Sequence, residues 1–300
     1  MKNRREFLFL YDVSWANPNG DPMDENKPRV DEETGINIVT DVRLKRTVRD
    51  QLADMEYEVF IREERDNEGK LKTKKNIFSN YGNDYKQVLE RCIDIRLFGG
   101  TFAIESERGN FTGPVQFKFG KSLHRVKVEL IKGTTVMPSG EGREQGTMTE
   151  VYVVPYSLIV FYGIANEKAS QDTGLKEEDI DAMLKAIWLG HKTSTDVISR
   201  SKFGHEPRLL VEIIYKEKTL THMGELDKLV SIESNKRDEE IRDIQELTLK
   251  LDKLKEKASK YKDKIEKVRY IVDDRLKIEP PLEEVFDNVT LEKFNWAEEI

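Results

Sequence analysis

Hydrophobic and polar residues alternate along the chain with two different periods. Glu6–Ser14 is strand-like on both faces, so this segment is predicted to be a central β-strand. Between residues 41 and 54, Leu44, Val48 and Leu52 recur every four residues, which predicts a helix with one buried stripe. Further strands are predicted over residues 115–119, 125–131, 149–162 and 208–215, and further helices over residues 83–97 and 177–189. This mixed order of strands and helices indicates an α+β fold.

Two polar segments rich in turn residues are expected to protrude from this core. The turn Asp66–Gly69 separates two strand-like stretches, so residues 57–78 are predicted to form a charged hairpin. Within residues 132–150, Pro138–Gly146 holds three glycines and a proline. That composition cannot bury a packed core, and it predicts a loop or hairpin tip that proteases cleave.

The last third of the chain carries a heptad pattern from Arg237 to Lys277. Two apolar series repeat every seven residues: Ile244, Leu251, Ala258, Ile265 and Val272, and Leu247, Leu254, Tyr261 and Val268. The pattern predicts one long helix that ends before Pro280, either as a coiled coil with a partner helix or laid on its own domain. We therefore expect a core over residues 1–230, and a C-terminal long helix and tail packed on it over residues 231–300.

The composition is that of a globular protein of 300 residues, with 37% hydrophobic and 36% charged residues. The longest apolar run, residues 156–162, is far shorter than the ~20 residues of a membrane-spanning helix, and no signal peptide is apparent. A cytoplasmic protein is expected. The single cysteine, Cys92, cannot form an internal disulfide, and the histidines show no zinc-ligand spacing with it. No cofactor is therefore predicted.

The distribution of charge favours a nucleic-acid partner, although the net charge of −7 alone argues against one. Residues 108–127 contain five basic residues and no acidic residue, and the polar side of the helix over residues 41–54 is basic. The loop Asn17–Asp21 offers amide groups, and Ser199–Gly204 combines cations, hydroxyls and one aromatic ring. Each segment alone also fits a solvated surface. Together they point to binding of an extended nucleic-acid backbone.

Aspartates near the N-terminus offer an alternative, which is metal-dependent chemistry. Asp12, Asp21, Asp24 and Asp31 are close enough in sequence to form a magnesium-type cluster. Turn chemistry explains Asp21 and Asp24 equally well, and no histidine or further acid completes a two-metal site at a recognisable spacing. The chain is therefore predicted not to be an enzyme.

Seven segments, spread in order over about residues 5–230, together resemble the Cas-seven backbone subunit of type I CRISPR Cascade complexes, most of all the subtype I-B form. They are Phe7–Pro22, Val39–Asp50, Asp94–Ala103, Gly113–Val126, Pro138–Glu150, Val154–Gly163 and Ser199–Leu210. The resemblance implies an RNA-recognition-motif-like (ferredoxin-like) core with inserted subdomains and a protruding thumb-like hairpin. It also implies antiviral defence in a filament of several copies along one CRISPR RNA, with other Cascade subunits, where the guide pairs with target DNA.

The resemblance further assigns roles to single residues. It implies RNA contacts from the early loop, the basic helix and two later segments: Asn17, Asn19, Arg29, Lys45, Arg46, Arg49, Lys121, Arg125, Ser201 and Lys202. The loop from Met137 to Thr147 matches the thumb better than the hairpin over residues 57–78 does. Related type III subunits cleave target RNA through a loop aspartate, so a ribonuclease using Asp24 or Asp31 is the alternative function. A protein scaffold that uses the heptad helix without RNA is the third.

Overall fold

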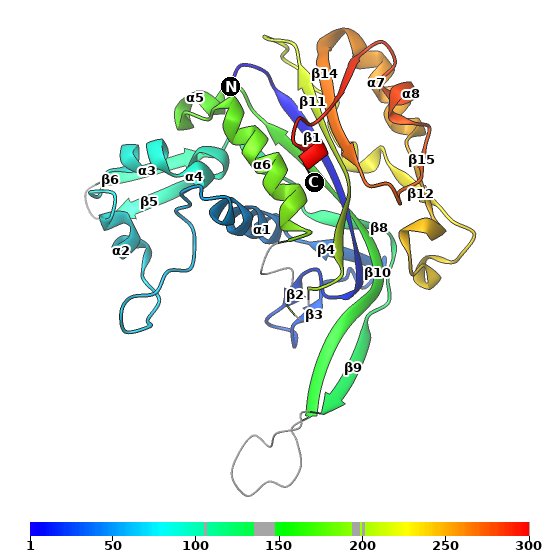
Figure 1. Ribbon diagram of the computed structural model, residues 1–300, viewed down its shortest axis with the longest axis horizontal. Helices are drawn as coiled ribbons and strands as arrows, with labels where there is room; N and C mark the ends of the chain where they lie inside the picture. Colours follow the sequence, from blue (N-terminus) through cyan, green and yellow to red (C-terminus); the bar gives the residue numbers. More distant parts are fainter. Residues whose placement is uncertain (105–106, 135–147, 194–198, 200–201, 300) are drawn as a thin grey trace, which may run out of the picture.

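A nine-stranded sheet forms the centre of the computed structural model, which describes residues 1–104, 107–134, 148–193, 199 and 202–299 (Figure 1). Its strands lie in the order β16-β14-β11-β1-β10-β8-β4, and β7 and β9 also pair with β10. Their bounds are β1 Arg5–Ala16, β4 Ile36–Val39, β7 Val115–Phe117, β8 Gly120–Arg125, β9 Glu129–Thr134, β10 Met148–Ala165, β11 His205–Tyr215, β14 Ile265–Val272 and β16 Thr290–Lys293. Because β1 pairs antiparallel with both β10 and β11, the predicted central strand is confirmed.

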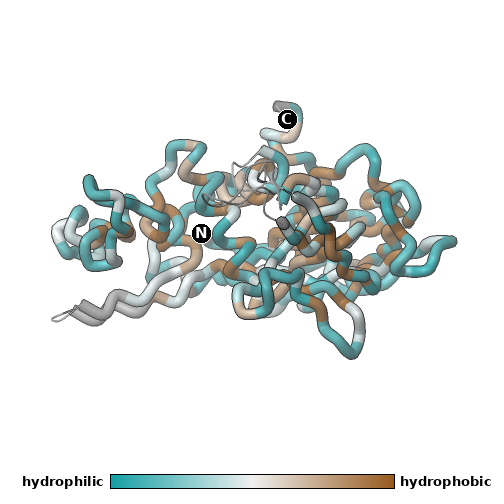
Figure 2. Tube along the Cα trace, turned by 90° about the horizontal axis from the view of Figure 1, so that it is seen from below, coloured by the Kyte–Doolittle hydropathy of each residue, from teal (hydrophilic) through white to brown (hydrophobic). Residues whose placement is uncertain are grey.

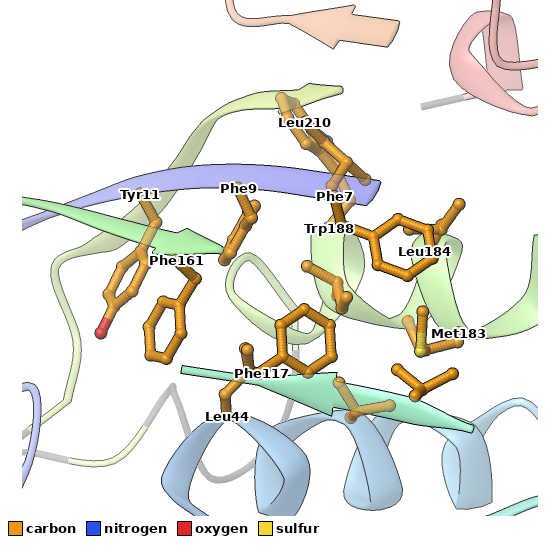
Figure 3. Packing of buried hydrophobic residues seen from close by; sticks show 14 of the residues in the cluster. Phe7, Phe9, Tyr11, Leu44, Phe117, Phe161, Met183, Leu184, Trp188 and Leu210 are labelled. Atoms are coloured by element: carbon orange, nitrogen blue, oxygen red, sulfur yellow. The ribbon is translucent and has the colours of Figure 1, made fainter. Parts of the chain in front are cut away.

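One face of the sheet is covered by helices α1 (Asp41–Asp54) and α6 (Glu177–Gly190), which confirms both predicted helices. The hydroxyl of Thr40 accepts a hydrogen bond from the Arg43 N–H at 3.3 Å and so begins α1, while the predicted stripe of α1 is buried. Figure 3 shows aromatic side chains of β1 gathered with residues of α1, α6 and neighbouring strands. This apolar layer fixes α1 against the sheet.

The other face of the sheet is covered by the C-terminal third of the chain. Side chains alternate along a strand, so Leu8 and Leu10 point away from the helices and into a second cluster with residues between 209 and 286. In Figure 2 the hydrophobic residues gather in the body of the molecule and the outer turns are mostly hydrophilic. Both faces of β1 are therefore covered, and a ligand meets this strand only at its ends.

The prediction of one long helix over residues 237–277 is wrong. This segment instead holds several short elements: η2 Asp238–Glu240, η3 Ile244–Glu246, β13 Thr248–Lys250, α7 Asp252–Tyr261, η4 Lys262–Lys264 and β14. Ile244, Leu251, Ala258 and Ile265 are all buried in the second cluster, but from different elements. The seven-residue spacing thus reflects the spacing of these elements, and β-branched residues after Ile265 favour a strand. A coiled coil over these residues is excluded.

The segment between α1 and β7 is an insertion with a small apolar cluster of its own, around Phe60, Phe78 and Val88. The Asp66–Gly69 turn forms and joins a short hairpin, in which Arg65 pairs with Leu71. The predicted hairpin over residues 57–78 is too long, because Thr73 caps a helix, α2 (Lys74–Ser79). The helix predicted over residues 83–97 is interrupted where Cys92 has extended backbone. Its parts are α3 Tyr85–Arg91 and α4 Ile93–Phe98, followed by the hairpin of β5 Gly99–Ile104 and β6 Glu107–Thr112.

A two-stranded arm projects from the sheet below the other elements in Figure 1. β9 pairs with β10 over residues 148–153, whereas β10 pairs with β1 over residues 154–165. The strand predicted over residues 125–131 is therefore wrong, since β8 ends at Arg125 and β9 begins at Glu129. The predicted thumb tip, Met137 to Thr147, lies outside the described residues. The remaining elements are β2 Gly20–Asp21, β3 Lys27–Pro28, α5 Ala169–Thr173, η1 Leu226–Lys228, β12 Ser231–Glu233, β15 Ile278–Glu279, α8 Leu282–Val285 and η5 Ala297–Glu299.

Candidate nucleic-acid interface

The basic residues of α1 are held by carboxylates. Lys45 Nζ lies 2.9 Å from Asp41 Oδ2, and Arg46 Nε lies 2.7 Å from Asp50 Oδ2, both at the i,i+4 spacing of a helix. The Lys45 side chain is largely covered and lies over the ring of Phe98, 5.7 Å from its centre. Arg46 remains about half exposed. The open basic face predicted for this helix is therefore reduced.

Arg49 is buried, so the prediction that it faces solvent is wrong. Its Nε donates to Asp94 Oδ2 at 2.9 Å, and its guanidinium lies over the Phe98 ring. The Asp94 carboxylate also accepts the backbone N–H groups of Phe60 and Ile61, at 2.8 and 3.1 Å. Because Asp94 has no exposed surface, this ion pair joins α1 to the insertion. Arg49 is a structural residue in this arrangement.

Residues of the early loop form a cluster with Lys202 at the end of β1. Lys202 Nζ donates to the Asn17 carbonyl oxygen at 2.6 Å, and Asn17 Nδ2 donates to the Asn26 carbonyl oxygen at 2.7 Å. The Oδ1 atom of Asn19 accepts both the N–H and the hydroxyl of Thr40, at 2.9 and 3.0 Å. We call Asn17, Asn19, Arg29 and Lys202 the loop cluster. It ties the loop to the beginning of α1.

Arg29 joins the loop cluster through its backbone, since its N–H donates to the Asn19 carbonyl oxygen at 3.2 Å. Its guanidinium is paired with Asp21 Oδ2 at 2.8 Å. The buried Oδ1 of Asn17 has no hydrogen-bond partner among the described residues. Asn17 itself is only 2% exposed, so this acceptor is enclosed by the protein. Ser201, also predicted here, lies outside the described residues.

Lys121 and Arg125 lie on the other face of the sheet. They share one side of β8 with Leu123, which packs against the second cluster. The Arg125 backbone N–H donates to Asp238 Oδ2 at 2.9 Å, and its Nε lies 3.5 Å from Glu239. The structure thus separates these two residues from the loop cluster. The acidic turn η2 lies beside Arg125, whose side chain is 62% exposed. Lys121 is exposed.

The basic stretch over residues 108–127 is further neutralised at Lys118. Its Nζ lies 2.8 Å from Asp227 Oδ2, in the turn η1 of the C-terminal third. Asp227 is mostly buried, so it is held in place beside the lysine. Three acidic residues of the C-terminal third, Asp227, Asp238 and Glu239, therefore lie next to basic residues of the stretch 108–127.

The four N-terminal aspartates do not come together. Asp12 is buried, pairs with Arg208 Nε at 3.0 Å and accepts the Tyr156 hydroxyl; burial raises its pKa to about 6, against the opposing effect of Arg208. Asp24 pairs with Lys27 at 2.7 Å, and Asp31 accepts the Thr34 hydroxyl at 2.7 Å. Within the part of the chain that the structure describes, no three histidine, cysteine or acidic residues are arranged to hold a metal ion. The magnesium cluster has no support there.

Sequence reasoning did not single out Trp15, a residue that the structure places next to the loop cluster. Its side chain is 55% exposed, and Phe203, next to Lys202, is 71% exposed. A tryptophan directly before a polar loop is the only sequence signal, because hydrophobic patterning alone assigns such a residue to the core. An end of the sheet with cations, amides and aromatic rings is suited to single-stranded nucleic acid.

Comparison with known proteins identifies the family of the chain. Residues 3–252 match the family model of CRISPR-associated protein Cas7. This chain belongs to the Cas7 family. A CRISPR-associated protein Cas7 of Haloferax volcanii is 30% identical over 309 aligned positions, which cover 92% of this chain and 89% of that protein.

Two solved structures share the fold of this Cas7 chain. One belongs to a CRISPR RNA-guided surveillance complex in a pre-nicking state, with 12% identity, a TM-score of 0.55, and coverage of 95% of this chain and 98% of that one. The other belongs to a CRISPR RNA-guided surveillance complex, with 13% identity, the same TM-score, and coverage of 95% and 97%. The predicted family is confirmed, and the subtype I-B form stays a prediction. No helix among the described residues is long and apolar enough to cross a membrane.

Proposed function

We propose that this Cas7 protein is the CRISPR RNA-binding backbone subunit of a Cascade surveillance complex, in which copies polymerise along the guide and support recognition of target DNA. The match to the Cas7 family over residues 3–252 carries this proposal. The guide supplies sequence recognition through base pairing, so the protein needs only to hold its backbone and shape. No chemical step is required of the chain.

The loop cluster is the proposed site for the guide backbone. Asn17 and Lys202 meet there although 185 residues separate them along the chain, and Asn19 and Arg29 join them through hydrogen bonds. Both faces of the central strand are covered, which leaves its end for the ligand. Lysine and arginine supply phosphate contacts, while amide groups reach sugar and phosphate oxygens. Copies repeated along one RNA add their contacts as multivalent binding.

The core of this protein is proposed to be ferredoxin-like, as in RNA-recognition motifs. Its support is the order β11-β1-β10-β8 in the sheet, with α1 after β1 and α6 after β10 in the sequence. The arm of β9 and β10 is the proposed thumb, because it projects from this core next to the loop that precedes α1 (Figure 1). The tip between Met137 and Thr147 is then the part that displaces a guide base.

Purification of the whole chain from cells that express a CRISPR array tests this function. We expect it to retain RNA of ~30–70 nucleotides with a common 5′ sequence, because a continuous groove protects the bound backbone. Sequencing of the bound RNA and native mass spectrometry give the guide and the number of copies per guide. The proposal is contradicted if the purified protein carries no RNA and also binds single-stranded RNA no more tightly than duplex DNA.

A further inference from the structure

Trp15 differs from the other tryptophans of the chain in its exposure. Trp188 and Trp296 are 3% and 5% exposed, whereas Trp15 is 55% exposed. Phe203 is 71% exposed. Exposed aromatic rings that lie together mark binding surfaces more often than isolated exposed residues do. The side chains of Trp15 and Phe203 can therefore form one binding surface if the fold brings these two residues together.

The backbone brings Trp15 and Phe203 to neighbouring strand ends. Val13 pairs with His205, and the Ser14 N–H donates to the Gly204 carbonyl oxygen at 2.9 Å. Trp15 follows this hydrogen bond on β1, and Phe203 precedes it on the segment leading into β11. Gly204 has φ +121°, and a Cβ there would lie 2.2 Å from the Ser14 carbonyl oxygen, so only glycine allows this approach. The pairing of the two strand ends is thus fixed by the chain itself.

Trp15 also has an unfavourable backbone conformation. Its φ is +51°, in the left-handed region that bulky residues rarely adopt. On β10, Val154 pairs with Ala16 and Tyr156 with Ser14, which places Pro155 opposite Trp15. Proline has no N–H, so the strand ladder lacks one donor there. Backbone strain at a residue whose side chain is exposed points to a function outside the folded core.

Two cations, Lys202 and Arg43, lie near this end of the sheet. Lys202 is the sequence neighbour of Phe203, with its Nζ 2.6 Å from the Asn17 carbonyl oxygen. Arg43 lies close enough to contribute to the lowered pKa of His191, which burial alone already brings down. In a chain of net charge −7, this combination fits a partner that carries phosphates beside flat rings.

We propose that Trp15 and Phe203 form a platform on which nucleobases of the bound guide RNA stack, next to phosphates held by the loop cluster. This inference rests on the proposed function, because the ligand is the guide. The other occupant, an apolar surface of a second copy, would not need the surrounding cations. Stacking tolerates any base, as a backbone subunit that holds guides of many sequences requires.

Tryptophan fluorescence reads this site directly, since Trp15 is the exposed tryptophan. We expect a single-stranded RNA of about 8 nucleotides, within the range one binding fold covers, to quench the emission and protect it from acrylamide. Trp15→Phe removes this signal and keeps binding, because the ring still stacks. Trp15→Ala lowers the affinity by about 5- to 150-fold, without changing the salt dependence, because stacking releases no counterions.

Two further variants control for the fold and for exposed aromatic residues in general. Trp15→Gly relieves the left-handed strain, so it should lower the affinity as Trp15→Ala does while the melting temperature is not lowered. Phe119→Ala removes an aromatic side chain that is 54% exposed between β7 and β8, and it should leave the affinity unchanged. Phe203→Ala should lower the affinity, by less than Trp15→Ala, because phenylalanine offers a smaller ring.

The outcomes separate the platform from the proposed function. Wild-type protein that binds RNA, with equal affinity in Trp15→Ala, overturns the platform and leaves the backbone function in place. Unchanged affinity for the short RNA together with weaker assembly on a long RNA assigns Trp15 to contact between copies, which also overturns the platform. Wild-type protein that binds no RNA overturns both.

Discussion

The loop cluster and β8 both carry cations that the sequence predicts to bind RNA, but different residues accompany them. At the loop cluster, Arg29 is paired with Asp21, whereas Lys202 contacts a backbone carbonyl and adjoins exposed aromatic rings. On β8, the Arg125 backbone N–H donates to Asp238, and its guanidinium lies 3.5 Å from Glu239. Carboxylates compensate nearby cations and repel phosphates. In an acidic protein, the position of the carboxylates therefore identifies a nucleic-acid surface better than the number of cations does.

The largest effect is expected where a predicted RNA contact is buried. Arg49→Ala leaves the Asp94 carboxylate without its cation in the interior, which should cost about 3–5 kcal/mol of unfolding free energy. Arg46→Ala, on the same helix but half exposed, is the matched control and should cost less than about 1 kcal/mol. Urea denaturation measures both. If the Arg49→Ala protein is as stable as the wild type and binds RNA more weakly, Arg49 contacts RNA and is not a structural residue.

Acid should weaken the fold beneath the loop cluster. Burial, with a smaller effect of Arg43, lowers the pKa of His191 from 6.5 to about 4, so the unfolded chain binds more protons than the folded chain between these values. Stability is then complete above pH 6.5 and falls as the pH drops towards 4, by about 3 kcal/mol from this residue. Burial likewise lowers the pKa of His205.

His191→Phe tests this pH dependence, because phenylalanine keeps the packing on Phe9 and Tyr11 without a titrating group. Denaturation midpoints between pH 4 and 7 should depend less on pH in the variant. Parallel curves for the variant and the wild type would show that other groups cause the acid sensitivity.

The contrast between the two basic regions predicts different salt dependence. Lys202→Ala should weaken binding of single-stranded RNA and flatten the log–log dependence on salt by roughly 0.7, the value for one phosphate contact. Arg125→Ala removes the same charge from a position beside Glu239, which compensates it, and should change neither quantity. Fluorescence anisotropy at several salt concentrations compares them. Equal effects of the two variants on affinity and salt dependence would show that β8 also contacts the RNA.

The smallest effect is expected for the loop aspartates. Asp24 and Asp31 bond to neighbours in their own turns, so Asp24→Ala and Asp31→Ala should leave guide-directed DNA binding within a few-fold. Guide-loaded protein incubated with complementary RNA and magnesium should leave that RNA intact. Cuts at a regular spacing, abolished by either substitution, would replace the backbone function with a ribonuclease.

Hydrophobic periodicity was sufficient to predict β1, α1, α6 and β11, because each buries a regular face or both faces. The same reasoning failed over residues 237–277, where a seven-residue repeat arises from several short elements that bury their residues against one sheet. Periodicity reports which residues are buried and leaves open how many elements carry them.

The site was predicted less well, because its contacts link distant parts of the chain. The pairing of Arg49 with Asp94 spans 45 residues, and no local pattern distinguishes Arg49 from the exposed Arg46. The contact of Lys202 with Asn17 was not predicted. The family resemblance implied only that both residues contact RNA. The left-handed backbone of Trp15 depends on its pairing partners, so it has no sequence signature.

The continuous strand β10 joins two parts of the protein that open at different energetic cost. Its residues 154–165 pair with the buried β1, so their amide hydrogens exchange only when the whole domain unfolds. Residues 148–153 pair with β9, whose side chains are largely exposed, and local opening suffices for their exchange. Pro155, which has no amide hydrogen, stands at the boundary. The arm can therefore fray and re-form around a ligand while the sheet that supports it stays folded.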